Sequence, residues 1–264
     1  MKNSAISWTT HTWNPWRGCT KVSPGCANCY AESLSLRTGH GHYRKGEARE
    51  RMSPAYWRQP YKWAKEARES GVTTRVFVAS LSDWLDDEVP IEWLADAVVT
   101  MFCTLPLGYL CLTKRPENFI PRFEAIYGLP STLENEDRRQ VAAMFLEGGL
   151  TSHVAVGVSV ENQDLSDKRR EAFRAIPAVQ KFVSYEPALG PVDWRGWEFV
   201  NQIIYGGESG PRARPADLQW ARNTRDFCRA NGIAFFMKQI GGVRDKQHDI
   251  DQFPDDLKIQ EFMP

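Results

Sequence analysis

The feature that most constrains the fold of this chain is an alternation of short apolar runs with amphipathic stretches. The apolar runs are 76–80, 109–112, 154–158, 181–183, 202–205 and 234–237. The amphipathic stretches are 90–104, 116–127, 164–175 and 215–231, with Pro90 and Gly232 as start and stop signals. Near-continuous apolar strands that alternate with helices are typical of a parallel sheet covered by helices. We therefore predict an α/β protein with a partial or complete (β/α) barrel, and an open doubly wound sheet as the alternative.

The segments outside this alternation are expected to be less regular. Residues 1–18 are expected to be extended and turn-rich, 30–36 to begin a helix, 38–61 to form a loop or insertion, 61–70 to form a helix, 128–152 to hold a surface helix, and the tail 243–264 to cover the bottom or side of the barrel. No internal stretch has the composition of a linker. We therefore predict a single domain over 1–264, with a cysteine loop at 13–31.

Size and charge restrict the class of protein. The chain has 264 residues and a formal net charge of zero, so it lacks the broad positive surface of many nucleic-acid-binding proteins. No apolar run approaches the roughly 18 residues that a membrane span needs. The first residues lack the apolar segment of a signal peptide. We therefore predict a cytoplasmic protein without membrane association, in which cysteines are metal ligands more often than disulfides.

Three of the six cysteines lie close together near the amino end of the chain. Cys19, Cys26 and Cys29 have six and then two residues between them, and Pro24-Gly25 predicts a turn before Cys26. Such a turn allows three thiolates to converge. Three thiolates suit an iron–sulfur cluster with one open iron, or a metal site completed from elsewhere in the chain. The remaining cysteines lie in apolar patterns and are expected to be buried and structural, namely Cys103, Cys111 and Cys228.

Polar and charged side chains follow each predicted strand. Since barrel active sites lie at the carboxyl ends of the strands, these residues are predicted to surround a cofactor and a substrate. The set consists of Ser82, Asp83, Lys114, Arg115, Ser159, Glu161, Asn162, Glu186, Glu208 and Lys238. Short polar side chains at such positions are often helix caps, which is an adequate reading of Ser82. Long charged side chains cap helices poorly. Gly206-Gly207-Glu208 is read either as a close approach to a ligand or as a tight turn.

Several motifs together resemble one known family. They are Trp13-Asn14-Pro15, the cysteine loop from Gly18 to Ala31, Val78-Ala79-Ser80-Leu81-Ser82-Asp83, Leu112-Thr113-Lys114-Arg115-Pro116, Gly157-Val158-Ser159-Val160-Glu161-Asn162, Ser184-Tyr185-Glu186-Pro187, Gly206-Gly207-Glu208-Ser209-Gly210 and Phe236-Met237-Lys238-Gln239. From about Trp8 to about Gly242, the chain resembles the phage- and prophage-encoded three-cysteine-motif family. That family is similar to radical S-adenosylmethionine (SAM) proteins such as spore photoproduct lyase.

The resemblance implies a barrel of the radical SAM type with an amino-terminal cysteine loop. Cys19, Cys26 and Cys29 would bind a [4Fe–4S] cluster, and SAM would chelate the fourth iron and be cleaved by one electron to a 5′-deoxyadenosyl radical. The implied substrate class is nucleic acid or a nucleotide. The interval of two residues before Cys29 matches the common radical SAM spacing, whereas the preceding interval is six residues instead of three.

Two other functions stay open on the sequence. The first is a binding module whose amino-terminal loop is held by zinc, with a histidine such as His11 as the fourth ligand. The second is an iron–sulfur protein that uses no SAM and acts with a partner protein. The sequence identifies no catalytic residue, substrate or oligomeric state.

Overall fold

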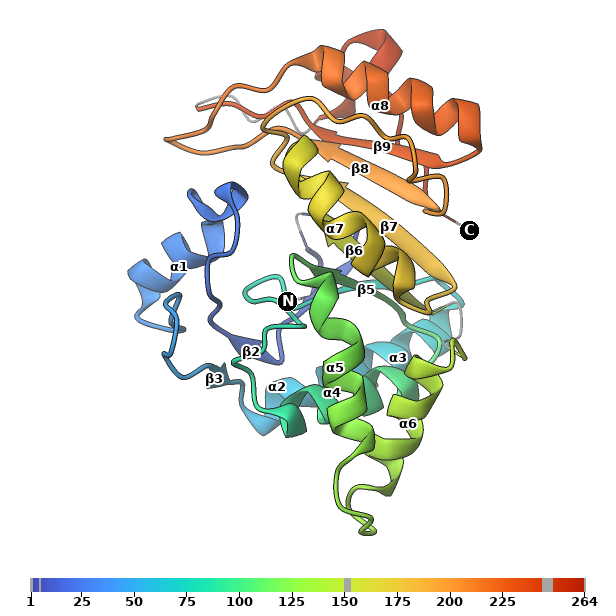
Figure 1. Cartoon of the computed structure of the whole chain (residues 1–264). Helices are drawn as coiled ribbons and strands as arrows, with labels where there is room; N and C mark the ends of the chain where they lie inside the picture. Colours follow the sequence, from blue (N-terminus) through green and yellow to red (C-terminus); the bar gives the residue numbers. More distant parts are fainter. Residues whose placement is uncertain (1, 5, 150–152, 244–248, 264) are drawn as a thin grey trace. The chain divides into compact units, whose positions relative to one another are not determined.

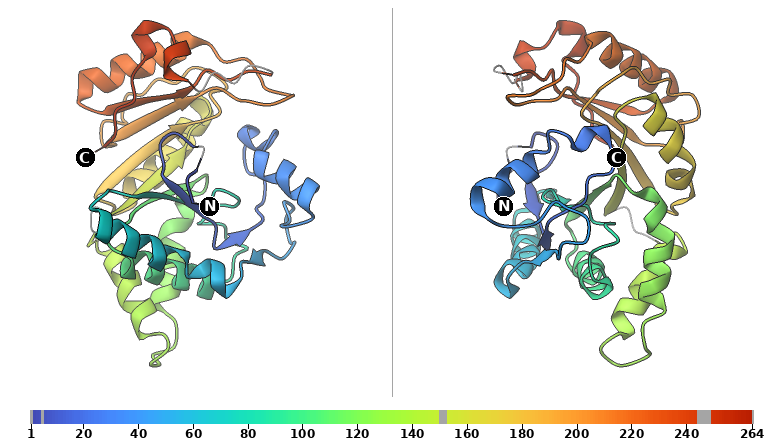
Figure 2. Two further views of the ribbon diagram at one scale, coloured as in Figure 1. Left: turned by 180° about the vertical axis from the view of Figure 1, so that it is seen from behind. Right: turned by 60° about the vertical axis from the view of Figure 1, so that its left-hand side comes forward.

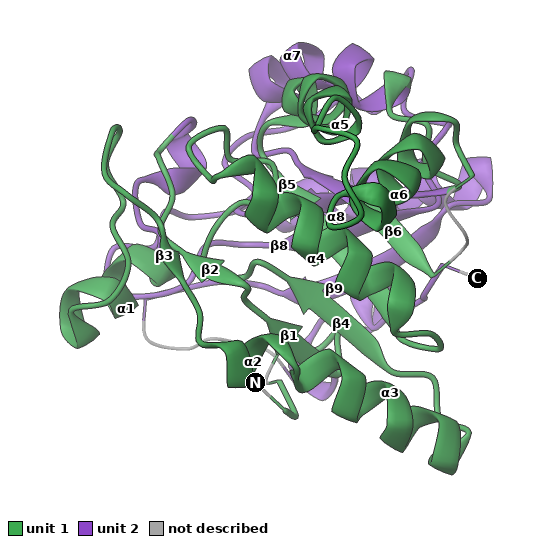
Figure 3. Cartoon of the chain, turned by 90° about the horizontal axis from the view of Figure 1, so that it is seen from below, with its two compact units in different colours: residues 1–21, 30–156, 175–179 green, residues 22–29, 157–174, 180–264 purple. Residues whose placement is uncertain are grey.

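The computed structural model describes residues 2–4, 6–149, 153–243 and 249–263. They form two compact units (Figure 3). Unit 1 comprises Met1–Lys21, Tyr30–Val156 and Ala175–Val179, and unit 2 comprises Val22–Cys29, Gly157–Arg174 and Gln180–Pro264. The cysteine loop is thus divided, because Cys19 belongs to unit 1 whereas Cys26 and Cys29 belong to unit 2. A single domain over 1–264 stays a prediction.

The strands form one large sheet and one small sheet (Figure 1). The strands are β1 (His11–Trp13), β2 (Trp16–Arg17), β3 (Glu50–Arg51), β4 (Arg75–Val78), β5 (Gly108–Thr113), β6 (Val154–Ser159), β7 (Gln180–Tyr185), β8 (Gln202–Gly206) and β9 (Ala234–Gln239). The large sheet has the order β1-β4-β5-β6-β7-β8-β9, and β2 pairs with β3 in antiparallel fashion. A doubly wound sheet reverses its strand order, and the described strands show no reversal. The prediction of an α/β protein with a parallel sheet is therefore confirmed. The strand order is that expected for a barrel and differs from that of a doubly wound sheet.

Helices connect most of these strands. They are α1 (Tyr30–Thr38), α2 (Pro54–Trp57), α3 (Gln59–Ser70), α4 (Ile91–Cys103), α5 (Phe119–Tyr127), α6 (Glu136–Leu146), α7 (Gln163–Ala175) and α8 (Leu218–Asn231), with short 3-10 turns at 24–26, 116–118, 250–252 and 255–257. The six predicted strands and the predicted helices at 90–104, 116–127, 164–175 and 215–231 are confirmed within a few residues. The left-handed backbone of Gly232 (φ 67°) ends α8, as its position predicts.

Two amino-terminal segments are more regular than expected. Residues 11–13 form β1, a strand of the large sheet, where the sequence suggested irregular extended chain. Residues 39–49 contain no helix or strand, as predicted, whereas 50–61 contain β3, α2 and the first residues of α3. Helix α2 begins at Pro54, and the hydroxyl of Ser53 caps it by accepting a hydrogen bond from the Tyr56 N–H at 3.3 Å.

The core of unit 1 contains strands β1, β4 and β5 and a helical layer. In the parallel ladder, Thr12 pairs with Phe77, and Phe77 pairs with Leu110. Helices α4, α5 and α6 lie against one another, as both views of Figure 2 show. Phe145 of α6 stacks on Phe123 of α5 with ring centroids 4.6 Å apart. The predicted surface helix in 128–152 is confirmed as α6, whose inner face packs through Val141, Ala142 and Phe145. Residues 150–152 of that segment lie outside the described residues.

The core of unit 2 is formed by β7, β8 and β9, with α8 packed on β8 and β9 (Figure 1). Tyr185 and Tyr205 are paired neighbours whose rings meet edge to face at 5.3 Å. Gly157 leaves room for the ring of Phe182, which a Cβ at position 157 would overlap. The β8–β9 ladder is in register up to Tyr205 and Met237 and shifts between Tyr205 and Gly206, at the carboxyl end of β8.

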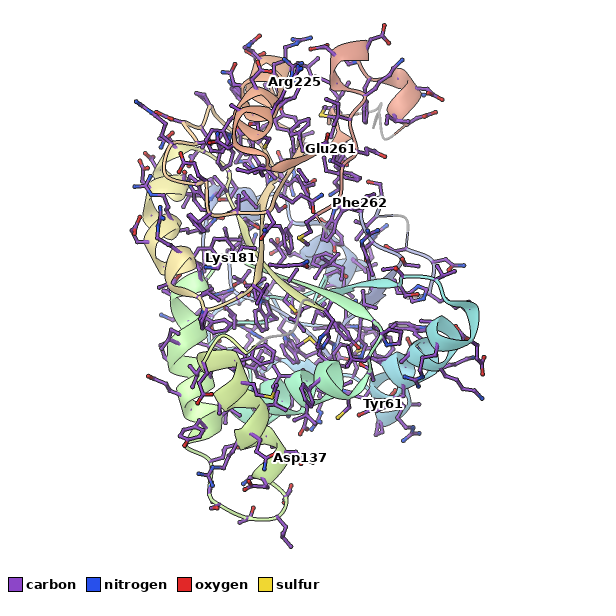
Figure 4. The ribbon with its side chains drawn as sticks, turned by 90° about the vertical axis from the view of Figure 1, so that its right-hand side faces the viewer. Tyr61, Asp137, Lys181, Arg225, Glu261 and Phe262 are labelled. Atoms are coloured by element: carbon purple, nitrogen blue, oxygen red, sulfur yellow. The ribbon has the colours of Figure 1, made fainter. Side chains whose placement is uncertain are left out.

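The C-terminal tail lies along β9. The Met237 N–H donates to the Ile259 carbonyl at 2.8 Å, and the Glu261 N–H donates to the Phe235 carbonyl at 3.0 Å. Figure 4 labels Glu261 and Phe262 on this segment, and the Phe262 ring lies 5.2 Å from that of Phe236. The tail thus covers the side of the sheet, one of its two predicted positions. Residues 244–248 and 264 of the tail lie outside the described residues.

All six cysteines are free thiols. Cys111 and Cys228 are buried, as predicted, whereas Cys103 is exposed. The prediction for Cys103 is wrong: this residue is the last of α4, and its side chain is exposed at the end of the helix. No helix within the described ranges is long and apolar enough to cross a membrane.

Candidate functional site

In unit 1, the thiol of Cys19 lies beside the guanidinium group of Arg115. The Nη1 and Nη2 atoms of Arg115 donate to Cys19 Sγ at 3.7 and 3.8 Å, and Nη2 also donates to the Thr20 carbonyl at 2.7 Å. Burial raises the pKa of the Cys19 thiol to about 12, with the charge of Asp83 adding to the increase and that of Arg115 opposing it. Cys19 is therefore a protonated thiol at neutral pH in the metal-free chain.

Asp83 holds Arg115 in this position. Its carboxylate accepts hydrogen bonds from the Thr113 hydroxyl at 2.7 Å, the Lys114 N–H at 2.8 Å and Arg115 Nη1 at 3.0 Å. The Leu85 N–H also donates to Asp83, at 3.0 Å. Burial opposes the charge of Arg115, but the nearby carboxylate of Asp83 raises the pKa of the Arg115 guanidinium group above its ordinary value. Asp83 therefore joins the residues that follow β4 and β5 into one network around Cys19.

Thr20, the residue after Cys19, is held by a second charged group. Its hydroxyl accepts from Arg49 Nη2 at 2.7 Å and donates to Glu88 Oε1 at 2.7 Å. Arg49 is buried and pairs with Asp86 at 2.8 Å. Two buried arginines thus hold Thr20, because Arg115 donates to its carbonyl and Arg49 donates to its hydroxyl. These bonds fix the unit 1 part of the cysteine loop.

In unit 2, the segment that carries Cys26 and Cys29 is attached to the carboxyl end of β6. The Ser23 hydroxyl donates to Glu161 Oε1 at 2.7 Å, and Glu161 is fully buried. Arg169 of α7 donates to Glu161 Oε2 at 2.8 Å and to the Ser159 carbonyl at 2.9 Å. A Cβ at Gly25 would lie 2.6 Å from Glu161 Oε1, so the loop backbone approaches this carboxylate as only glycine permits.

A second attachment joins the same segment to the end of β8. Asn28 Nδ2 donates to Glu208 Oε2 at 3.1 Å, and Arg214 Nη2 donates to Glu208 Oε1 at 2.6 Å and to the Pro24 carbonyl at 3.0 Å. Burial opposes ionisation of Glu208, but the hydrogen bonds from Arg214 and Asn28 outweigh it and lower its pKa. The carboxylate is therefore charged, and it accepts hydrogen bonds from Asn28 of the loop and from Arg214.

Glu186, which follows β7, forms an ion pair with Lys238 of β9. Lys238 Nζ lies 2.6 Å from Glu186 Oε1, and the Ser184 hydroxyl donates to Glu186 Oε2 at 3.1 Å. A side chain at Gly206 would overlap this carboxylate. The two side chains remain partly exposed, at 13% for Glu186 and 23% for Lys238. The ion pair lies at the carboxyl edge of the unit 2 strands, and Glu186 Oε1, the oxygen that faces Lys238, is itself buried.

The remaining predicted residues differ in their surroundings. Ser82 Oγ donates to the Trp16 carbonyl at 3.4 Å, a structural contact within unit 1. Asn162 Oδ1 accepts from the Leu165 N–H at 3.1 Å and so caps the start of α7, which is the common role of Asn before a helix. Ser159 is buried in β6, and Lys114 donates its backbone N–H to Asp83.

Among the described residues, no three His, Cys, Asp or Glu side chains form a group that could hold a metal ion. His11, the histidine suggested as a zinc ligand, lies in β1 with its ring 4.6 Å from that of Trp63 and its Nδ1 2.8 Å from the Thr10 carbonyl. Ligation by Cys19, Cys26 and Cys29 stays a prediction.

The chain matches the family described as "Protein of unknown function (DUF5131)" over residues 3–258. It belongs to this family. The matched span includes the cysteine loop and every predicted site residue up to Lys238. Comparisons with curated proteins and with solved structures found no match.

Four residues that hold the loop of this DUF5131 chain were not predicted from the sequence. Ser23 and Asn28 lie inside the cysteine motif, whereas Arg169 and Arg214 lie in or directly before predicted helices, and none of the four directly follows a predicted strand. The available signal was the surplus of acidic residues at strand ends, since a buried carboxylate needs a cationic partner. The sequence did not show which arginine pairs with which glutamate. Arg169 follows Glu161 by eight residues and Arg214 follows Glu208 by six, so the two pairs share no common spacing.

Unit 1 of the DUF5131 chain also contains a cavity of about 710 Å³, away from the cysteine loop. It is lined by residues of β3, α2, α4 and α6, including Arg51, Trp57, Asp96 and Arg138. Both arginines bind the same carboxylate, with Arg51 Nη2 2.6 Å from Asp96 Oδ2 and Arg138 Nη2 2.6 Å from Asp96 Oδ1. Glu134, which lies 3.6 Å from Arg138, and Asp137 also line the cavity, so its lining carries three carboxylates and two guanidinium groups.

Proposed function

We propose that this protein is an iron–sulfur enzyme of the radical SAM kind, with a [4Fe–4S] cluster on Cys19, Cys26 and Cys29. One observation carries the proposal: the segment with Cys26 and Cys29 is attached to the carboxyl ends of β6 and β8 through Glu161 and Glu208. Proteins with parallel sheets place their reactive groups at this end of the strands. A short cysteine segment bound there by buried carboxylates suits a reactive metal group.

The donor chemistry of the three cysteines fits an iron–sulfur cluster. All three are free thiols with partly exposed side chains, and thiolates are the usual ligands of such clusters. Cys19, Cys26 and Cys29 would hold the cluster, and each thiol would give up its proton on ligation. The fourth iron would remain open to SAM.

When bound, the cluster would supply the electron for reductive cleavage of SAM. The residues of this chain would position SAM and the substrate. Glu186 and Lys238 are the best suited, because they carry opposite charges, remain partly exposed and do not hold the cysteine segment. We propose that this ion pair opens to bind the charged groups of SAM or of a nucleic acid or nucleotide substrate.

Anaerobic purification tests the proposal. The protein is reconstituted with iron and sulfide, and metal content, acid-labile sulfide and visible absorbance are measured per chain. We expect four irons and four sulfides, as a [4Fe–4S] cluster requires, with the loss of most of both in Cys26→Ala. Cys103→Ala, which removes an exposed thiol outside the loop, is the matched control and should retain the cluster.

The alternatives give different results. A colourless protein with stoichiometric zinc would refute the cluster and support a zinc-stabilised binding module. A loaded protein that releases no 5′-deoxyadenosine from SAM under reducing conditions, alone or with nucleic acid, would refute the use of SAM. It would then support an iron–sulfur protein that acts with a partner.

A further inference from the structure

The cavity of unit 1 is a feature that the proposed function does not use. Its volume of about 710 Å³ lies within the range of about 300–1,000 Å³ that is usual for small-molecule sites. All residues that line it belong to unit 1. Part of the lining is apolar and consists of Met52, Pro54, Trp57 and Val99. Such a lining favours a ligand with an apolar body, because apolar surface is removed from water on both sides.

The charged part of the lining is organised around Asp96. Its carboxylate accepts from Arg51 Nη2 at 2.6 Å, from Arg138 Nε at 2.9 Å and from Arg138 Nη2 at 2.6 Å. The guanidinium group of Arg51 also lies over the Trp57 ring, 4.6 Å from the ring centroid. An anionic ligand that approached either arginine would meet the charge of Asp96. The two arginines are therefore poorly placed to bind an anion.

The other two carboxylates of the lining give the cavity an excess of negative charge. Glu134 lies 3.6 Å from Arg138 Nη1 and, with Asp96, balances the two guanidinium groups. Asp137, labelled in Figure 4, is exposed in the first turn of α6. Its carboxylate forms no hydrogen bond or ion pair with the part of the chain that the structure describes. Asp137 is thus the charge in this cavity that a ligand would balance.

We propose that the cavity binds a small organic cation with an apolar body, and that Asp137 is its counter-ion. The ammonium group of the ligand would donate to the Asp137 carboxylate, and charge-assisted hydrogen bonds of this kind are the strong ones. The apolar body would lie against the apolar part of the lining. The site and its ligand are separate from the three cysteines, so the inference does not rest on the proposed function.

Three ligands of similar size and different charge test the proposal, namely 2-phenylethylamine, 2-phenylethanol and 3-phenylpropionate. Titration of the full chain at neutral pH, followed by the NMR signals of each ligand, gives the dissociation constants. We expect the amine to bind more tightly than the alcohol, and the carboxylate to bind least. Asp137→Asn should weaken binding of the amine about tenfold, because it removes a hydrogen bond to a charged group. It should leave binding of the alcohol unchanged.

Glu136→Gln is the matched control. Glu136 precedes Asp137 in the same first turn of α6, but it is not among the described residues that line the cavity. We expect this variant to change the affinity for the amine by less than about twofold, since exposed charges that do not contact the ligand are screened by salt. Val99→Phe places a larger side chain in the cavity and should weaken binding of the amine and the alcohol alike. Val99→Leu serves if the Phe variant does not fold.

Four results would overturn the proposal. They are no binding of the amine to the native protein, equal affinities for the amine and the carboxylate, binding that a folded Val99 variant leaves unchanged, and equal losses in Asp137→Asn and Glu136→Gln. Equal losses would show that the two acidic residues act only on the amino end of α6. Thermal unfolding without ligand shows whether each variant is folded.

Discussion

Asp83 in unit 1 and Glu161 in unit 2 are both buried carboxylates that follow a strand of the large sheet, yet they support the cysteine loop in different ways. Asp83 holds Arg115, and Arg115 contacts the sulfur of Cys19 itself. Glu161 accepts from Ser23, three residues before Cys26, and from Arg169. Ser23 Oγ does lie 3.7 Å from Cys26 Sγ, but its hydrogen bond to Glu161 is much shorter.

The difference separates two tasks within the cysteine loop. In unit 1 a charged group is brought to the sulfur of Cys19, which would affect the electronic properties of a metal bound there. In unit 2 the chain around the ligands is fixed by short bonds to strand ends, which affects how the ligands are presented. We therefore expect substitutions around Asp83 to affect the properties of the metal as well as stability. Substitutions around Glu161 should act on stability and loading.

The largest effect should come from removing the carboxylates. Asp83→Ala leaves Arg115, the Thr113 hydroxyl and two backbone N–H groups without their acceptor. We expect the free energy of unfolding to fall by about 3–5 kcal/mol. For Glu161→Ala we expect the lower end of that range, because Asp83 accepts hydrogen bonds from four residues, Leu85, Thr113, Lys114 and Arg115, whereas the bonds to Glu161 come from Ser23 and Arg169. Urea unfolding followed by tryptophan fluorescence measures both. A larger loss for Glu161→Ala would contradict the comparison.

An intermediate effect is expected from Gly25→Ala. The added Cβ would lie 2.6 Å from Glu161 Oε1 and 2.8 Å from its Cγ, and this buried side chain has little room to move. We expect a loss of about 1–3 kcal/mol, together with weaker iron retention in the reconstituted protein. Gly108→Ala is the control, since the nearest atom to its Cβ would be the Thr74 carbonyl oxygen at 3.8 Å. Equal stabilities of the two variants would show that the loop does not need its close approach to Glu161.

The smallest effect concerns the pH dependence contributed by Glu208. Its pKa lies below the ordinary value, so its stabilising contribution is complete above the unfolded-state pKa of about 4.3 and is lost as the pH falls through the folded-state pKa. The difference in unfolding free energy between the native protein and Glu208→Gln should therefore be largest at neutral pH and shrink below about pH 4.3. Thermal unfolding across this pH range measures it. In an Arg214→Met background the shrinkage should largely disappear; a difference that stays constant with pH would refute the prediction.

The sequence predicted the parts of this molecule that depend on local pattern. The six apolar runs and the helix limits at Pro90 and Gly232 follow from periodicity and backbone preference. The three-residue strand β1 was missed because His11, Thr12 and Trp13 are too few to show alternation. Its place in the sheet comes from pairing with β4, more than sixty residues later.

The candidate site was predictable in its members but not in their roles. Strand-end position drew attention to Asp83, Glu161 and Glu208, and the two glutamates stood out because long acidic side chains are poor caps. Their partners come from distant positions: Ser23 and Glu161 are separated by 138 residues, and Asn28 and Glu208 by 180. Nothing local in the sequence distinguishes a carboxylate that awaits a ligand from one that anchors a loop.

The tail along β9 has a practical consequence for handling this protein. Residues 259–261 occupy hydrogen-bonding positions on the outer side of that strand, and the Gln202 amide also donates to the Glu261 carbonyl at 2.7 Å. A protein shortened before residue 258 would leave backbone N–H and C=O groups of β9 unpaired at the edge of the sheet. Such an edge promotes pairing between molecules and aggregation. A purification tag is therefore better fused to the amino end, and a soluble shortened variant would be a poor substitute for the full chain in any spectroscopic study.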